Sequence, residues 1–152
     1  MRRSDSEIKD PSEIEAIVKR ARICNLGLND NGMAYVVPVN YGYDAGCLYI
    51  HSAKEGRKID VLGKDNRVAF AIHTDEEVVG AEKNCGWGMK YRCVMGVGRA
   101  SLLTDRVEKE RALGIIMKQH GSSGTEFDPA QVEKILIIKV EISSMTGKKA
   151  RC

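Results

Sequence analysis

Residues 33–53 read Met-Ala-Tyr-Val-Val-Pro-Val-Asn-Tyr, then Gly-Tyr-Asp-Ala-Gly, then Cys-Leu-Tyr-Ile-His-Ser-Ala. Two runs rich in aromatic and β-branched residues are separated by a short segment with two glycines, a pattern typical of a β-hairpin. An Asn-Asp-Asn-Gly sequence at 29–32 predicts a tight turn before them, after an extended segment at 23–28. We therefore expect three consecutive strands here, each joined to the next by a turn.

Three further strands are predicted downstream. Residues 66–73 are apolar on both faces, which favours a central strand. Residues 91–103 form a long strand with Gly96 and Gly98 on one face, where a bend or a close approach is expected. The last strand alternates most clearly: Leu136, Ile138, Val140 and Ile142 on one face, Lys139, Glu141 and Ser143 on the other.

Three helices are predicted between the strands. The first follows a capping box formed by Ser12 and Glu15, the second covers about 55–62 and ends at Gly63, and the third runs from an acidic capping pair to Gly121. In the first helix the residues expected to face inward are Ile14, Ile17, Val18 and Ala21. The third helix starts with the capping pair Asp105 and Glu108, and its residues expected to face inward are Val107, Leu113, Ile116 and Met117. Residues 74–90 and 122–128 show no period and are predicted to be loops.

The order is helix, three strands, helix, two strands, helix, strand. Hairpins dominate and no βαβ repeat is present, so we expect a mainly β protein, an antiparallel barrel with flanking helices. The 152 residues suit one domain over 1–152, with a flexible N-terminus at 1–11. A Rossmann site is not expected, because no Gly-x-Gly-x-x-Gly follows a strand.

Composition narrows the functional classes. The net charge is +3, a mild value that suits one anionic small ligand at least as well as nucleic acid. Five cysteines without a Cys-x-x-Cys pair predict reduced thiols and no zinc site. No apolar run approaches the ~20 residues of a membrane helix, and no hydrophobic stretch follows the charged N-terminus. We expect a cytoplasmic protein that binds neither membrane nor nucleic acid.

The segment His51-Ser52-Ala53-Lys54-Glu55-Gly56-Arg57-Lys58 lies where a strand is predicted to end and a helix to begin. Helix N-termini favour phosphate, Arg57 can bind its oxygens in bidentate fashion, Lys58 adds a second charge, and the Ser52 hydroxyl can donate. The alternative is an exposed polar turn with solvated side chains.

A second segment, Val37-Pro38-Val39-Asn40-Tyr41, carries a proline inside a predicted strand. Proline removes a hydrogen-bond donor from the sheet, which indicates an edge, a bulge or a kink. Free backbone groups there, with the Asn40 amide, suit the polar rim of a flat heterocycle. An ordinary edge strand is the alternative.

Taken in order, six segments resemble the pyridoxamine-phosphate-oxidase-like flavin-binding family, and within it the branch that includes nitroimidazole-resistance proteins. They are Pro38–Tyr41, Leu48–Ala53, Gly56–Lys58, Asn66–Phe70, Lys90–Ala100 and Met145–Ala150. The similarity runs in register from about residue 21 to 150. It implies an FMN-binding split β-barrel and a homodimer with two FMN molecules in clefts between the subunits.

The resemblance also assigns residues. By position, Arg57, Lys58 and Ser52 would bind the phosphate, and the backbone of Val37, Pro38, Val39 and Asn40 would follow the isoalloxazine ring. Tyr91, Arg92 and Cys93 would close the cleft, from the same or the other subunit. Cys93 stands where many relatives have serine, and residues 147–152 lack the arginine- and histidine-rich end needed for vitamin B6 oxidation.

The histidines and the single tryptophan remain. His51 falls where nitroimidazole-resistance proteins have a histidine beside the flavin, and imidazole suits proton transfer near pH 7; a histidine bonded to backbone is the alternative. Trp87, the only tryptophan, either covers the flavin or anchors its loop. His73 and His120 are interpreted as structural or surface residues.

The leading hypothesis is an FMN-dependent oxidoreductase that reduces a small nitroaromatic acceptor. A flavin-binding store or sensor without turnover is the second, and a split barrel that uses haem or a deazaflavin is the third. A nucleic-acid-binding barrel comes last, because two phenylalanines and one tryptophan offer little base stacking.

Overall fold

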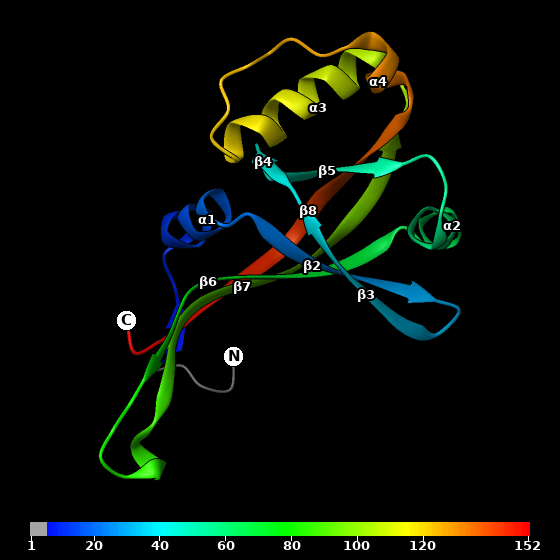
Figure 1. The fold of residues 1–152 in the computed structure, drawn as a ribbon. Helices are drawn as coiled ribbons and strands as arrows, with labels where there is room; N and C mark the ends of the chain where they lie inside the picture. Colours follow the sequence, from blue (N-terminus) through cyan, green and yellow to red (C-terminus); the bar gives the residue numbers. More distant parts are fainter. Residues whose placement is uncertain (1–5) are drawn as a thin grey trace.

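The structure, a computed structural model, describes residues 6–152 (Figure 1). In chain order its elements are β1 (Glu7–Ile8), α1 (Pro11–Arg20), β2 (Ile23–Asp30), β3 (Met33–Asn40), β4 (Gly42–Asp44), β5 (Cys47–Ala53), α2 (Arg57–Lys64), β6 (Arg67–Val79), the 3₁₀ turn Asn84–Gly86, β7 (Gly88–Leu103), α3 (Arg106–Gln119), α4 (Pro129–Glu133) and β8 (Ile135–Ala150).

All strands belong to one antiparallel sheet, in the order β3-β2-β6-β7-β8-β5-β4, with β1 added to β8. The sheet curves but does not close, because within the described residues no pairing joins its two end strands, β3 and β4. This mainly antiparallel sheet with four α-helices in residues 6–152 is consistent with the predicted split barrel.

The core lies inside the curved sheet. Tyr41, Leu26, Ile50, Ile72 and Ile138 are fully buried there, and α1 contributes Ile14, Ile17 and Val18. The inward face predicted for the first helix is thus confirmed. Its predicted capping box is wrong: Asp10 is the N-cap and accepts a hydrogen bond from the Ser12 N–H at 2.9 Å, with Pro11 in the first turn.

The close approach predicted at the β7 glycines is confirmed. A Cβ atom on Gly96 would collide with the Phe70 ring, and one on Gly98 with the Glu141 carbonyl. The register between β7 and β8 also shifts between Val97 and Gly98. The two glycines therefore lie where neighbouring groups approach β7 closely and where its pairing with β8 is irregular.

The largest correction concerns residues 74–90, for which the sequence predicts a loop. β6 continues to Val79 and β7 begins at Gly88, so a two-stranded arm leaves the body of the molecule (Figure 1). A β-bulge between Thr74 and Glu77 marks its base. Both faces of this ribbon are largely exposed, so its sequence lacks the alternation that burial imposes.

The helices hold smaller corrections. α2 covers Arg57–Lys64, so Gly63 lies inside it rather than ending it, and α4 interrupts the predicted stretch before the last strand. Val107 is 73% exposed and Met117 38% exposed, so their inward assignment is wrong. α3 buries Lys109 instead, whose ammonium donates to the carbonyls of Val132 and Ile135 at 2.7 and 3.1 Å.

The predicted flexible N-terminus falls partly on residues 1–5, which lie outside the described residues. Glu7 and Ile8 pair with Lys148 and Gly147, and Ile8 is buried. Among residues 6–152, no helix is long and apolar enough to span a membrane.

Candidate functional site

The junction of β5 and α2 encloses a hollow of about 380 Å³, here called the β5–α2 hollow. Its lining comes from one residue of β3 and from the end of β5 through the start of α2: Tyr35, His51, Ser52, Ala53, Glu55, Gly56, Arg57 and Lys58. Gly56 has φ +121°, a conformation that favours glycine, and it turns the chain from strand to helix. The segment predicted from sequence to hold phosphate therefore forms a concave site.

The N-terminus of α2 is open toward this hollow. Gly56 provides no side-chain cap, and its carbonyl accepts from the Ile59 and Asp60 N–H groups, which starts the helix. The N–H groups of Arg57 and Lys58 point out of the first turn without helical partners. Together with the helix dipole they favour an anion.

Arg57 is oriented by two residues that the sequence did not indicate. Its Nε and Nη2 atoms each lie 2.9 Å from Asp30 Oδ2, and its guanidinium lies 4.3 Å from the centroid of the Tyr35 ring. Both partners belong to the β2–β3 hairpin. The turn at 29–32 was predicted, but nothing in its sequence indicated that it would meet α2.

Lys58 is half-buried beside Arg57, and burial lowers the pKa of its ammonium group. No carboxylate lies within 4 Å of it among residues 6–152. Ser52 is 8% exposed and also lines the hollow. A bound anion would supply the countercharge that Lys58 lacks.

His51 is exposed at the rim of the same hollow. In the described part of the chain its ring makes no hydrogen bond. The structure therefore does not have the alternative arrangement, in which the histidine is bonded to the backbone. His73 instead bonds Glu76 and Asn25, and His120 bonds the Tyr41 carbonyl. Of the three histidines, His51 is the one placed to meet a ligand in the hollow.

The strand Val37–Asn40 lies at the open edge of the sheet. Pro38 pairs with Asn25 of β2, and the other side of β3 has no partner strand in residues 6–152, which is where a proline is tolerated. Pro38 and Asn40 are exposed, Val37 is half-buried and Val39 is buried. The edge is available to a ligand, and its contact with a flavin stays a prediction.

Trp87, Tyr91, Arg92 and Cys93 lie elsewhere. Arg92 and Cys93 pair with Lys149 and Lys148 near the end of β8, whereas Ser52 pairs with Leu136 near its start. Figure 1 accordingly has α2 and the arm at opposite ends of the molecule. One chain does not bring these predicted cofactor residues to the β5–α2 hollow.

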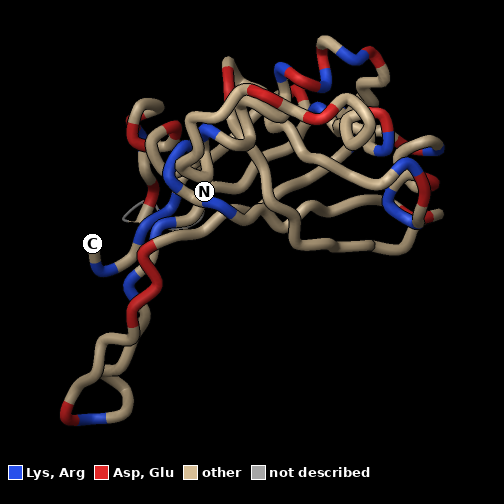
Figure 2. Tube along the Cα trace, turned by 45° about the horizontal axis from the view of Figure 1, so that its top comes forward, with Lys and Arg blue, Asp and Glu red and all other residues tan. Residues whose placement is uncertain are grey.

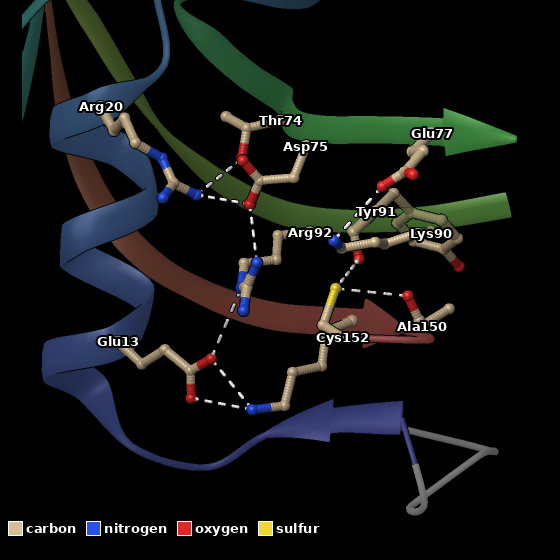
Figure 3. A network of polar contacts seen from close by, with 11 residues as sticks. Glu13, Arg20, Thr74, Asp75, Glu77, Lys90, Tyr91, Arg92, Ala150 and Cys152 are labelled. Carbon is tan, nitrogen blue, oxygen red and sulfur yellow. Dashed lines mark hydrogen bonds and ion pairs between the residues drawn. The ribbon is translucent and has the colours of Figure 1, made fainter. Parts of the chain in front are cut away.

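Arg92 is occupied by an ion-pair network at the base of the arm (Figure 3). Its Nη1 donates to Asp75 Oδ2 at 2.7 Å, and the same oxygen accepts from Arg20 Nη2 at 2.6 Å. Glu13 lies 3.9 Å from Arg92 Nε and accepts from Lys149 at 3.0 Å. The hydrogen bond from Arg92 is the main cause of the lowered pKa of the Asp75 carboxyl.

Trp87 is anchored within the arm. Its indole N–H donates to the Ala81 carbonyl at 2.8 Å, and a Cβ on Gly80 would lie 3.6 Å from its ring. The side chain is still 55% exposed. Anchoring and covering a ligand are thus not exclusive roles for this residue.

The convex face of the sheet, here called the outer face, is apolar and open. It contains two adjoining hollows of about 520 and 780 Å³, and the residues that share it include Gly27, Val36, Ala69, Ala71, Met95 and Val97. In Figure 2 the charged residues gather on helices, turns and the base and tip of the arm, and the middle of the sheet is largely uncharged. This face is suited to cover by another protein surface.

The five cysteines range from buried Cys24 to exposed Cys85 and Cys152. All five are unpaired, and burial raises the pKa of Cys24 to about 12 and that of Cys93 above its ordinary value. Residues 6–152 contain no cluster of three or more metal-ligating side chains.

Comparison with known proteins identifies the family. The chain matches the family model for pyridoxamine 5'-phosphate oxidase over residues 10–149. Its structure is similar to that of a candidate 5-nitroimidazole antibiotic resistance protein from Bacteroides thetaiotaomicron, with 33% identity and a TM-score of 0.84 over 94% of this chain and 86% of that one. No curated protein sequence matches.

Two more distant structures share the fold. The flavocytochrome Anf3 from Azotobacter vinelandii is 19% identical, with a TM-score of 0.85 over 100% of this chain and 72% of that one. An FAD and heme binding protein from Mycobacterium smegmatis is 14% identical, with a TM-score of 0.85 over 97% and 74%. The family resemblance inferred from six short segments is confirmed, and the chain belongs to the pyridoxamine 5'-phosphate oxidase family.

Proposed function

We propose that this protein binds FMN and uses it to reduce a small acceptor of the nitroaromatic class. The observation that carries the proposal is the β5–α2 hollow, where Arg57, Lys58, Ser52 and an uncapped helix N-terminus converge. This donor set suits a phosphate monoester, which carries about −1.5 to −2 charges at pH 7. The resistance protein that is 33% identical to this chain supports the nitroaromatic class.

The phosphate contacts follow from the donors. The Nε and Nη2 atoms of Arg57 hold Asp30, and its remaining N–H groups are free to meet phosphate oxygens beside the Lys58 ammonium. The cations at the hollow form a single phosphate site, and no dinucleotide fingerprint accompanies it. FMN is therefore favoured over FAD, although distant structures of this fold are described as binding FAD.

The ring would lie along the open edge of β3, where Pro38 and Asn40 are exposed. FMN supplies the redox chemistry when bound, and the chain supplies binding, orientation and proton transfer. His51 is the proposed proton donor, because its imidazole is exposed at the rim of the hollow and imidazole is the side chain suited to proton transfer near neutral pH. Its ring is free to turn toward an acceptor stacked on the flavin.

We further propose that the functional unit is a homodimer. Tyr91, Arg92 and Cys93 lie far from the β5–α2 hollow within one chain, so a second copy must bring them there if they close the cleft. The apolar outer face is the surface on which two copies would pack. Each copy would then complete the site of the other.

The test is an absorbance spectrum of the protein as purified, followed by titration with FMN and with FAD. We expect flavin absorbance or rapid FMN uptake, tighter FMN than FAD binding, and nitroaromatic reduction when a reductant is supplied. Flavin bound without turnover would favour a store or sensor. Haem absorbance, or FAD binding that excludes FMN, would contradict the proposal.

A further inference from the structure

A cleft of about 550 Å³ lies between α1 and α3, at the end of the molecule away from α2 (Figure 1). This α1–α3 cleft is within the size range of small-molecule sites, about 300–1,000 Å³. It shares no lining residue with the β5–α2 hollow or with the outer face. The side chains that decide its chemistry are Lys19, Tyr43, Asp44, Arg111, Ile115 and Lys118.

The walls of the cleft are held together by one side chain, that of Gln119, which also lines it. Its Nε2 donates to the carbonyls of Val18 and Ala21 at 2.9 and 2.6 Å, and its Oε1 accepts from the Tyr43 N–H at 2.9 Å. A single amide therefore joins the end of α1, the strand β4 and the end of α3. Because the walls are already fixed, little conformational entropy is lost when a ligand binds between them.

Two cations of the cleft lack close partners in the described chain. Arg111 Nη2 lies 3.9 Å from Asp44 Oδ2, which is longer than a hydrogen bond, and Lys118 has no carboxylate within 4 Å. Lys19, in contrast, pairs with Glu15 at 3.0 Å. The sequence explains the difference, since Glu15 precedes Lys19 by four residues and no acidic residue lies three or four positions from Lys118.

Lys118 is also not needed to cap α3. The N–H groups of residues 120–122 already bond the carbonyls of residues 116–118. Arg111, Ile115 and Lys118 are separated by four and three residues, so they share one face of the helix, with the half-buried isoleucine between the two cations. The same three residues border a second hollow of about 520 Å³ against the Gly-Ser-Ser-Gly-Thr loop at 121–125, whose hydroxyls add hydrogen-bond donors beside the cations.

The balance of charge indicates the class of ligand. Three cations face two carboxylates, those of Asp44 and Glu15, so the cleft keeps one net positive charge. The nearby end of α3 is the negative end of its dipole, which disfavours a dianion such as phosphate. The planar fork of a guanidinium matches a carboxylate. A monocarboxylate therefore suits this cleft better than a phosphate ester does.

The walls indicate the body of that ligand. Tyr43 and Ile115 are half-buried, and each packs on a part of the core while it also lines the cleft. A flat apolar group that enters between a phenol ring and an aliphatic side chain buries both faces.

From these observations we propose that the α1–α3 cleft is a second ligand site, which binds a small aromatic carboxylate. Arg111 and Lys118 hold the carboxylate, and Tyr43 and Ile115 contact the ring. The inference does not rest on the proposed flavin or on the proposed dimer.

The test is a titration of the protein with sodium benzoate, followed by the backbone amide signals in NMR spectra. We expect the amides of residues 43–44 and 115–119 to shift, with a dissociation constant of about 1 mM. Inorganic phosphate at the same concentrations should not shift them. Arg111→Ala/Lys118→Ala should raise the dissociation constant at least tenfold, because both charged donors are lost.

Two further variants sharpen the test. The control Arg106→Ala/Lys134→Ala removes the same two types of charge from exposed positions at the start of α3 and after α4, and it should change the dissociation constant by less than about twofold. Asp44→Asn removes the carboxylate beside Arg111 and should tighten benzoate binding by about threefold. Thermal melting of each variant verifies that it is folded.

The outcomes separate this site from the flavin site. No amide shift up to about 20 mM benzoate, shifts confined to other surfaces, or equal binding by Arg111→Ala/Lys118→Ala would overturn the proposal. Phosphate that shifts the same amides as strongly as benzoate would overturn the assignment to an aromatic carboxylate. Arg57→Ala/Lys58→Ala should bind benzoate like the parent, and Arg111→Ala/Lys118→Ala should bind FMN like the parent, so failure of one proposal leaves the other standing.

Discussion

The β5–α2 hollow and the arm are opposite cases within one sheet. At the hollow, a buried strand runs into an amphipathic helix, and basic residues stand at the junction. At the arm, the same kind of antiparallel pairing continues without a core beneath it. The sequence pattern predicted the strand and the helix of the first region, and it predicted a loop for the second.

The difference shows what periodicity detects. Alternating hydrophobicity records the contrast between a buried and a solvated face within one chain. The arm has no such contrast in a single copy, so its strands carry no recognisable signal. If the arm docks on a second copy, its exposed apolar residues are buried between chains rather than within one chain.

Replacing His51 should have the largest effect at the hollow. His51→Ala should lower nitroaromatic turnover per bound flavin by about 10²–10⁴-fold, because a proton donor beside the ring is lost. Its melting temperature should not change, since the side chain is exposed and makes no hydrogen bond in the described residues. Turnover equal to that of the parent would return His51 to a surface role.

Asp75→Ala tests the base of the arm. Arg20 and Arg92 would lose the carboxylate that joins them, and an exposed ion-pair network contributes modestly to stability. We expect amide exchange in residues 76–90 to accelerate by roughly fivefold while amides of β5 exchange as before. Equal acceleration in both regions would mean that the arm and the body unfold together.

In contrast to His51→Ala, which should impair the site at the hollow, Asp30→Asn should strengthen FMN binding there. The amide keeps a hydrogen-bond acceptor for Arg57 but removes a negative charge beside the proposed phosphate. FMN affinity should therefore rise, by about threefold for one partly screened charge. Weaker FMN binding by the Asp30→Asn variant would indicate that the carboxylate is needed to orient Arg57.

The smallest effect is a pH dependence of the arm. The folded-state pKa of Asp75 is below its usual value, mainly because Arg92 donates to it, so its contribution is present above the unfolded pKa of about 3.9. It is lost as the pH falls through the lower folded-state pKa. Resistance of the arm to proteolysis should thus be constant from pH 7 to 5 and decrease only below about 4. A decrease between pH 7 and about 6 would contradict the assignment to Asp75.

Local patterns predicted most of the strands, the turn from strand to helix before Arg57 and the close approach at Gly96 and Gly98. The hairpin expected from residues 33–53 is wrong in its pairing, because β5 pairs with β4 and β3 pairs with β2. They could not predict which distant elements meet. Asp30 and Tyr35 reach Arg57 because the β2–β3 hairpin curls back to α2, and no local signal encodes that curl. The capping error at Ser12 has a different cause, since Asp10 and Ser12 both suit an N-cap and Pro11 favours the earlier start.

The predicted cofactor residues also fall into a local group and a distant group. Ser52, Arg57 and Lys58 are close to each other in sequence, and the structure keeps them together. Tyr91, Arg92 and Cys93 came from the family resemblance, and Trp87 was selected as the only tryptophan. Within one chain these residues lie far from the hollow. A role for them at the hollow would require a second copy, which no pattern in a single sequence describes.

The central claim is that the hollow at the start of α2 holds the FMN phosphate. The most direct measurement is an FMN titration of Arg57→Ala/Lys58→Ala against the control Lys64→Ala/Lys118→Ala, which removes two exposed lysines elsewhere. Charge-assisted hydrogen bonds contribute about 1.5–3 kcal/mol each, so the first variant should bind FMN at least tenfold more weakly and the control should bind like the parent. Equal FMN affinity in a folded Arg57→Ala/Lys58→Ala protein would contradict the claim.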